Sequence, residues 1–218
     1  MNIPIRKIRP TRGRHYRSKI GSPKSLMTIH AESLLERDYV RLCNFDPRIK
    51  KIYYQPIGIL FNYEGRKRRY FPDYLLVTED NRIFLVEVKL KEFVSTNLNK
   101  AKFFSAAKLC GEKDWTFIVV TEDQIRPGCL QKNLRLLHEV ERYSITPSVV
   151  EYIKTMLELM GPCTIVDLRN ACNIIEPSLL MLNLHKMIYA CDIRTDLVNH
   201  PLNDSSLLWN KVKEDTCG

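Results

Sequence analysis

The chain has 218 residues, 44% of them apolar and 27% charged, an ordinary composition for a globular protein with one large domain or a main domain and a small companion. No apolar run approaches the roughly 18–20 residues that a membrane span requires, and the basic N-terminus lacks the apolar core of a secretory signal, so we expect a cytoplasmic protein without membrane contact. The seven cysteines form no CxxC pair, which argues against a zinc site and predicts reduced, mostly buried thiols.

The net charge of +9 is unevenly distributed along the chain. Residues 1–146 contain 28 Lys and Arg against 16 Asp and Glu, a balance of +12, whereas residues 147–218 contain 6 against 9, a balance of −3. This excess predicts a polyanionic partner for the first part of the chain and not for the second.

Residues 1–25 are predicted to form a basic N-terminal arm. Eight Lys and Arg precede Glu32, the first acidic residue, with Pro and Gly between them, so the segment cannot bury a core by itself. It is either a solvated tail or an arm that neutralises DNA phosphates and becomes ordered on binding. The candidate phosphate contacts in the arm are Arg6, Lys7, Arg9, Arg12, Arg14 and Arg17.

Residues 26–145 are predicted to form an α/β domain with a mixed sheet flanked by helices. Apolar residues at steps of three and four over 31–42 indicate an amphipathic helix, which ends at the latest at Pro47. A hairpin with its turn at "NYEG" is expected within 51–77, followed by a strand at 82–90 whose nearly unbroken apolar run predicts burial on both faces. The remaining expected elements are a helix, a buried strand and a helix, at 95–111, 115–121 and 129–143.

Residues 146–218 are predicted to form a small, mostly helical domain. Three helical segments follow one another closely, and two short strand-like pieces, "IRTDL" and "SSLLW", come after them. This is the pattern of a winged-helix module, in which the third helical segment, 177–190, is the recognition helix. Its only basic side chains are His185 and Lys186 and the domain is acidic, so we expect a protein-binding face rather than a DNA-binding one.

Three charged residues stand inside the apolar stretch "FPDYLLVTEDNRIFLVEVK". Glu87 and Lys89 are two apart on one strand and therefore share a face. Asp73 is at the start of the preceding strand, which meets the end of the next strand in an antiparallel pair. A buried carboxylate must be paired or bind a cation, so this cluster is either a structural ion pair at the rim of the sheet or a metal site.

Neighbouring residues favour the metal site. Glu36, on the helix upstream, provides a third carboxylate, and the run Arg66, Lys67, Arg68 and Arg69 places four cations beside the same strand. Carboxylates suit Mg²⁺, with Mn²⁺ as a substitute, because Mg²⁺ prefers oxygen ligands and leaves positions for water and substrate phosphate. A nearby Lys stabilises charge on a phosphate during cleavage. There is no GxxxxGK[ST] loop to support an ATPase.

Pro72-Asp73 followed by Glu87-Val88-Lys89 resembles the PD-(D/E)xK motif of restriction-endonuclease-like nucleases. Over residues 26–140 the wider pattern "ESLLERDYVRLCNFDPRIKKIYYQP…RYFPDYLLV…FLVEVK" resembles, more narrowly, the TnsA endonuclease subunit of heteromeric, Tn-seven-like transposons. The resemblance implies a restriction-endonuclease-like mixed sheet flanked by helices, with the small winged-helix-like domain after it.

The same resemblance implies a role for each matching residue. Glu36, Asp73 and Glu87 are the expected Mg²⁺ ligands, and Lys89 is the expected catalytic lysine. The family's spacing to the Gln of "QP" selects Glu36 rather than Glu32. That Gln, Gln55, either supports the metal ligands or the substrate, or is an ordinary strand residue before a Pro.

The resemblance also implies specific partners. TnsA-type subunits cut the 5′ strand at each transposon end, while a DDE transposase, TnsB, cuts and joins the 3′ strand under an AAA+ regulator, TnsC. In relatives encoded beside CRISPR systems, an RNA-guided complex chooses the target. We therefore expect double-stranded transposon-end DNA, a TnsB-like transposase and a TnsC-like regulator as partners of a bacterial, nucleoid-associated protein, with the regulator bound through the acidic C-terminal domain.

Two other functions are compatible with these residues. A stand-alone restriction or repair nuclease of the same superfamily cleaves DNA without partners. A DNA-docking adaptor uses the carboxylates only in structural ion pairs and binds no metal.

Overall fold

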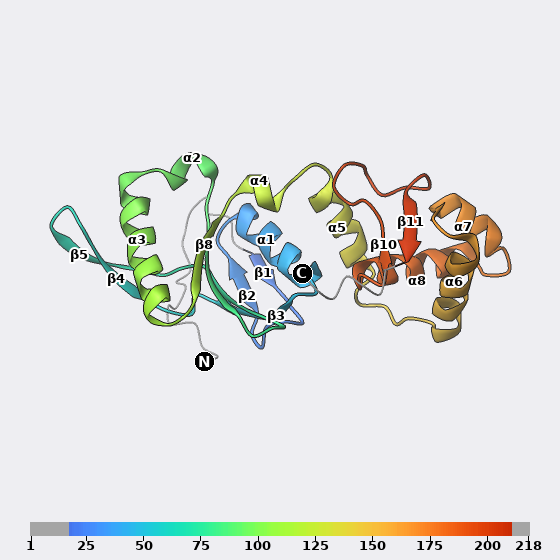
Figure 1. Cartoon of the computed structure of the whole chain (residues 1–218), viewed down its shortest axis with the longest axis horizontal. Helices are drawn as coiled ribbons and strands as arrows, with labels where there is room; N and C mark the ends of the chain where they lie inside the picture. The colour runs from blue at the N-terminus through green and yellow to red at the C-terminus, as the bar shows by residue number, and fades with distance from the viewer. Residues whose placement is uncertain (1–17, 211–218) are drawn as a thin grey trace. The chain divides into compact units, whose positions relative to one another are not determined.

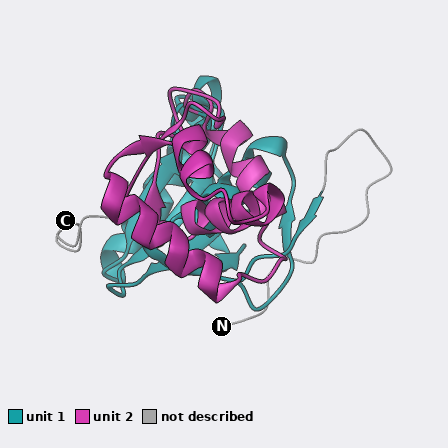
Figure 2. Cartoon of the chain, turned by 90° about the vertical axis from the view of Figure 1, so that its right-hand side faces the viewer, with its two compact units in different colours: residues 1–126 teal, residues 127–218 magenta. Residues whose placement is uncertain are grey.

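A computed structural model describes residues 18–210, and the chain packs into two compact units that divide between Arg126 and Pro127 (Figure 2). This division comes earlier in the chain than the boundary predicted at 145/146. The reason is that helix α5, Leu130–Glu139, packs against helix α8 of the second unit. Asn133 of α5 strengthens this packing, since its Nδ2 donates to the backbone oxygens of Leu197 and His200, both at 2.8 Å.

The predicted basic arm is only partly described. Its six candidate phosphate contacts, from Arg6 to Arg17, lie outside the described residues. Residues 18–25 belong to the first unit, because β1, Ser18–Ile20, pairs antiparallel with β2, Ile29–Ala31. Within this segment, Lys24 Nζ donates to the Cys43 backbone oxygen at 2.9 Å and to that of Asp46, so the lysine caps the C-terminal end of the following helix.

A four-stranded mixed sheet is the centre of the first unit. Its order is β3–β6–β7–β8, antiparallel except for the parallel pair β7–β8. The strands span Ile49–Tyr54 (β3), Tyr74–Thr78 (β6), Ile83–Val88 (β7) and Thr116–Val120 (β8). This mixed sheet with flanking helices confirms the predicted α/β fold of the restriction-endonuclease-like type.

Alternate residues of the central strands enter two separate cores, as expected for side chains that point to opposite faces. Leu76 and Val86 pack with residues of α1, Leu34–Phe45, whereas Leu75 and Leu85 pack with residues of α3, Asn97–Glu112. Figure 1 shows the two helices on either side of the sheet. Because helices cover both faces, β7 reads as a nearly continuous apolar run.

The segment 51–77, predicted as one hairpin, contributes to four strands. Between β3 and β6 the chain forms a separate two-stranded sheet from β4, Ile59–Tyr63, and β5, Arg66–Tyr70. Its turn is formed by Glu64 and Gly65, whose φ angles of 51° and 71° suit a two-residue hairpin turn. The chain leaves β3 at Gln55 and rejoins the sheet after Pro72, which cannot donate to a strand ladder.

Two short helices complete the first unit: α2, Lys91–Val94, and α4, Glu122–Ile125. Thr96 caps α3 by accepting from the backbone N–H of Asn99, which is one of the two caps that the sequence predicts. The helix continues one residue past Gly111, the predicted stop.

Over residues 127–210, the second unit combines four helices with a small three-stranded sheet in the order β10–β11–β9. The helices are α5, already described, Pro147–Met160 (α6), Ile165–Ala171 (α7) and Pro177–Tyr189 (α8). The strands are Cys163–Thr164 (β9), Ile193–Arg194 (β10) and Leu207–Asn210 (β11). The expected helices and both strand pieces are present, and the winged-helix assignment stays a prediction.

Two broad expectations from composition can be compared with the structure. Across residues 18–210, no helix combines the length and the apolar character that crossing a membrane requires. Cys43, Cys110, Cys163 and Cys172 are buried, as predicted. Burial raises the pKa of the Cys43 thiol to about 12, so this cysteine stays protonated and unreactive near neutral pH.

Candidate functional site

Asp73 and Glu87 are brought together by the antiparallel pairing of β6 and β7. Tyr74 lies opposite Val86, so the residues just before and just after them, Asp73 and Glu87, are neighbours across the two strands. The Oδ2 atom of Asp73 accepts a hydrogen bond of 2.8 Å from the backbone N–H of Val88. The prediction that these two carboxylates meet at one end of the strand pair is therefore confirmed by the register.

Glu87 is buried, with 3% of its surface exposed, and each of its carboxylate oxygens has a partner. Lys89 Nζ lies 3.0 Å from Oε1, and the hydroxyl of Tyr70 donates to Oε2 at 2.8 Å. Lys89 and Glu87 thus share a face of the strand, as their spacing predicts. Sequence reasoning missed Tyr70, because no local pattern relates a residue at the end of β5 to a carboxylate on β7.

Glu36 belongs to the N-terminal end of α1 and takes part in its cap. Ser33 Oγ accepts from the backbone N–H of Glu36 at 3.1 Å. In return, the Glu36 carboxylate accepts from the backbone N–H of Glu32 at 2.8 Å and from the Ser33 hydroxyl at 3.0 Å. This reciprocal arrangement is close to the Ser-x-x-Glu capping box, which satisfies backbone donors at a helix start.

The charges of this region act on one another. Burial raises the pKa of Asp73 well above its ordinary value, and the carboxylates of Glu87 and Glu36 raise it further. Burial also raises the pKa of Glu36, which lies within range of the Lys89 charge. Burial lowers the pKa of Lys89, but Glu87 and the other two carboxylates outweigh it and hold the value above normal. The helical carboxylate is therefore electrostatically part of the cluster, and Lys89 stays protonated.

Gln55 is not an ordinary strand residue. It follows β3 with a φ of 40°, which is uncommon for a residue other than Gly, and it is 3% exposed. Its backbone N–H donates to the Asp73 backbone oxygen at 2.8 Å, so Gln55 holds the chain where it enters β6. Its buried Oε1 has no hydrogen-bond partner within residues 18–210. The role of Gln55 as a support for the metal ligands or the substrate stays a prediction.

The chemistry of the donor atoms suits Mg²⁺, because the three candidate ligands are carboxylates and the buried amide oxygen lies on the segment bonded to Asp73. As the side chains lie, no group of three or more His, Cys, Asp or Glu in the described part of the chain is arranged to hold a metal ion. Asp73 and Glu87 are already adjacent, whereas Glu36 is engaged in its helix cap.

Comparison with known families adds independent information about the first unit. Residues 46–122 match the family model described as TnsA-like endonuclease N terminal. The first unit contains a TnsA-like endonuclease domain. Asp73, Glu87 and Lys89 lie within the matched residues, and Glu36 precedes them. None of the curated proteins matches the chain significantly.

The basic hairpin of the TnsA-like domain carries its four cations on two faces. Arg66 and Arg68 lie opposite Tyr63 and Phe61 in the β4–β5 register, and they share a face with these aromatic residues. The guanidinium of Arg68 lies 5.1 Å from the centre of the Tyr63 ring. The other two basic residues of β5, Lys67 and Arg69, are exposed and point to the opposite face. DNA that contacts all four cations must therefore reach both sides of the hairpin.

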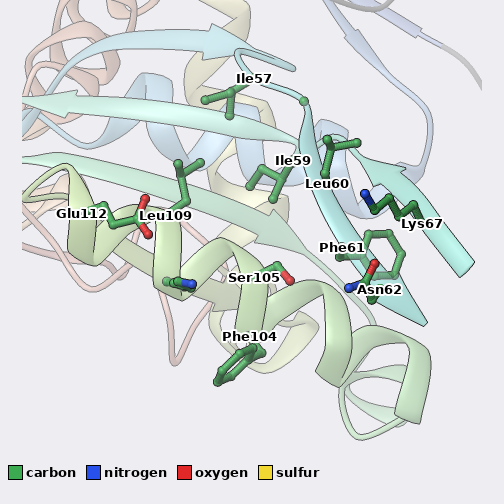
Figure 3. Close-up of a pocket in the computed structure, with 12 residues that line it drawn as sticks. Ile57, Ile59, Leu60, Phe61, Asn62, Lys67, Phe104, Ser105, Leu109 and Glu112 are labelled. Atoms are coloured by element: carbon green, nitrogen blue, oxygen red, sulfur yellow. The ribbon is translucent and has the colours of Figure 1, made fainter. Parts of the chain in front are cut away.

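A groove of about 660 Å³ also lies in the TnsA-like domain, between β4 and α3 (Figure 3). Ile57 and Leu60 line it from the hairpin side, and Phe104 and Leu109 line it from α3. None of the three residues of the acidic cluster, Glu36, Asp73 and Glu87, lines this groove, and its walls are largely apolar. It is therefore separate from the candidate site for phosphodiester chemistry.

In the second unit, the two candidate basic contacts of the predicted recognition helix are poorly suited to DNA. Lys186 Nζ donates to the backbone oxygens of Glu141, at 3.0 Å, and of Tyr143. Burial lowers the pKa of His185, which therefore favours the neutral form. Both observations are consistent with the expectation that this helix does not read DNA.

Proposed function

We propose that this chain is the Mg²⁺-dependent DNA endonuclease subunit of a cut-and-paste transposase. In this proposal it cuts the 5′ strands at transposon ends, beside a TnsB-like DDE transposase and under a TnsC-like AAA+ regulator. The observation that carries the proposal is the meeting of Asp73, Glu87 and Lys89 at one end of β6 and β7, inside residues that match the TnsA-like endonuclease model.

The chemistry follows from the position and charge of these side chains. Asp73, Glu87 and Glu36 would hold the cation through their carboxylate oxygens. Bound Mg²⁺ supplies a water of lowered pKa and stabilises charge on the leaving oxygen. Lys89 is protonated beside Glu87 and stabilises the negative charge that builds on the phosphate during cleavage. The basic hairpin and the N-terminal arm hold the DNA backbone by charge.

The net charge of each part of the chain indicates which partner it binds. A net excess of Lys and Arg in residues 1–146 suits double-stranded DNA, whereas the acidic residues 147–218 suit a protein partner. We assign the regulator to the second unit, because its two candidate basic DNA contacts on α8 are engaged or neutral.

A reconstituted cleavage reaction tests the proposal. The purified chain is combined with a TnsB-like transposase and a TnsC-like AAA+ protein, and with a plasmid that carries the transposon ends on which they act. We expect 5′-strand nicks at the ends that require Mg²⁺ or Mn²⁺ and disappear in Asp73→Ala and Lys89→Ala. The matched control is Glu79→Ala, which removes an exposed carboxylate near the far end of β6. Normal cleavage by both site variants rules the proposal out.

Two further outcomes separate the alternatives. Sequence-specific cleavage by the isolated chain, at a rate that the partners do not change, favours a stand-alone nuclease. Titration calorimetry with Mn²⁺ identifies an adaptor, because an adaptor shows no metal binding that is lost in Asp73→Asn.

A further inference from the structure

A second lysine reaches the acidic cluster from a different element. Lys102 is on α3, and its Nζ lies 5.7 Å from the centre of the Tyr70 ring. The hydroxyl of this ring donates to Glu87 Oε2 at 2.8 Å. Glu87 in turn pairs directly with Lys89, so Lys102 approaches through the Tyr70 ring the same carboxylate that Lys89 contacts.

Lys102 has no dedicated counter-ion. Within residues 18–210 it forms no ion pair, and its hydrogen bond to Asn99 Oδ1 is long, at 3.4 Å. Glu87 already binds Lys89 and Tyr70 through both of its oxygens. Burial lowers the pKa of Lys102 and the neighbouring charge of Lys89 lowers it further, and together they outweigh the carboxylates of Glu87 and Asp73, which raise it. A half-buried ammonium group beside a second ammonium group is costly unless an anion joins them.

Other lysines of α3 do not share this environment. Lys108, further along the same helix, is exposed and lines the apolar groove instead. The position of Lys102 is therefore specific to the side of α3 that faces Tyr70, and it is not a general property of a basic helix. Cations that meet a phosphate from two directions are a common means of stabilising charge in phosphodiester cleavage.

We propose that Lys102 contacts a phosphate oxygen of the DNA strand at the point of cleavage, opposite Lys89. This inference rests on the proposed nuclease function and assigns a substrate-contacting residue that the PD-(D/E)xK pattern does not contain. Tyr70 holds the lysine by its aromatic face, so the ammonium group keeps its charge and its donors for the substrate. The incoming phosphate supplies the direct ion-pair partner that Lys102 does not have within residues 18–210.

A variant that removes only the charge of Lys102 tests this role. Lys102→Met keeps the length and apolar stem of the side chain, and Lys108→Met is the matched control on the same helix. We expect Lys102→Met to lower the rate of strand nicking in the reconstituted reaction by about 100-fold. Binding of the same DNA without divalent metal should change by less than about threefold, because one of many phosphate contacts is lost. Lys108→Met should match the wild type in both measurements.

The outcomes distinguish this inference from the proposed function. If the wild-type chain and Lys102→Met nick DNA equally well while Lys89→Met is inactive, only the role of Lys102 is wrong. If Lys102→Met loses as much DNA binding as nicking, Lys102 is a general backbone contact and the inference is wrong. If the wild-type chain does not nick DNA with its partners present, the proposed function and this inference both fail.

A measurement on the wild-type protein avoids the use of variants. Acetylation of lysines is followed by mass spectrometry with and without transposon-end DNA. We expect the DNA to slow acetylation of Lys102 and to leave that of Lys108 unchanged. Equal acetylation of Lys102 in both conditions contradicts the proposed contact.

Discussion

The hydroxyl of Tyr70, at the end of the basic hairpin, donates a hydrogen bond of 2.8 Å to Oε2 of Glu87 on the central sheet. Tyr70 is 5% exposed and packs against Phe61 of the hairpin, with ring centres 6.5 Å apart. The bond therefore ties the orientation of a candidate metal ligand to the root of the hairpin that is proposed to hold DNA.

The first prediction concerns this hydrogen bond. Tyr70→Phe keeps the ring and its packing and removes only the hydroxyl, so Oε2 of Glu87 loses its buried donor. Removal of a group that orients a metal ligand typically weakens metal binding by about 10- to 100-fold, and we expect a loss of this size for Mn²⁺ measured by calorimetry. Tyr63→Phe, in the same hairpin, is the control and should bind Mn²⁺ normally. Equal affinities in the two variants mean that the hydroxyl does not position Glu87.

The second prediction concerns the effect of the Asp73 charge on the stability of the metal-free protein. Its folded-state pKa is raised by burial and by the carboxylates of Glu87 and Glu36, so the metal-free protein loses stability as the pH rises from the unfolded value of 3.8 to that raised value. Asp73→Asn removes this charge. We expect it to stabilise the metal-free first unit by about 1 kcal/mol or more, a typical cost of an uncompensated buried polar group, while it abolishes nicking. A lower melting temperature than that of the wild type in EDTA at pH 8 contradicts this expectation. Glu79→Gln, an exposed carboxylate, should change neither property.

The third prediction concerns Asp38, which is buried in α1 beside three guanidinium groups. Its oxygens lie 2.9 Å from Arg41, 3.1 Å from Arg37 and 2.7 Å from Arg126. Burial raises the pKa of Asp38, but hydrogen bonds from Arg126 and Arg37 outweigh it and hold the value below the ordinary 3.8. Asp38→Asn breaks this buried network, and we expect it to cost the first unit about 3 kcal/mol at neutral pH.

The pH dependence of this contribution has a definite sign. Because the folded-state pKa is depressed, the stabilisation is fully present above the unfolded value of 3.8 and is lost as the pH falls through the folded value. Hydrogen exchange of the α1 amides in urea, at pH 7 and at pH 3, measures the difference. Glu64→Gln, which removes a surface ion pair of 3.5 Å with Arg68, is the control and should cost less than about 1 kcal/mol. A pH-independent difference between wild type and Asp38→Asn contradicts the assignment.

The fourth prediction concerns Gly128, at the start of the second unit. Its φ is +48°, and a Cβ atom placed there lies 2.3 Å from the Val198 backbone oxygen. The adjacent Cys129 backbone N–H donates to the same oxygen at 2.7 Å, so the loop cannot move aside without losing this bond. We expect Gly128→Ala to destabilise the second unit by about 1–3 kcal/mol, through strain and displaced backbone.

A second glycine provides the matched control for this substitution. Gly111 lies inside α3, and no atom outside its own helix comes within 4 Å of a Cβ placed there. Gly111→Ala should therefore stabilise the first unit by about 0.5–1 kcal/mol, because Ala is the better helix former. Calorimetric melting of both variants checks the opposite signs. Equal effects of the two substitutions show that the close approach to Val198 carries no strain.

Much of the candidate site is predictable because it depends on local rules. The alternation of side chains on a strand places Glu87 and Lys89 on one face, and a short turn between antiparallel strands returns the chain to Asp73. Other predictions failed at longer range. The segment predicted as one hairpin contributes to two separate sheets, because β3 skips the β4–β5 hairpin and pairs with β6. Helix α5 was expected in the first domain but packs with α8.

By itself, the sequence determined the α/β class, the mixed sheet and the meeting of Asp73, Glu87 and Lys89, since strand periodicity and short connections specify all three. Only the tertiary structure decided that Tyr70 bonds to Glu87, that Lys102 approaches from α3 and that Asp38 pairs with Arg126. These contacts join elements far apart in the chain, and their geometry depends on how helices and strands pack. No periodicity within either partner's own segment encodes that packing.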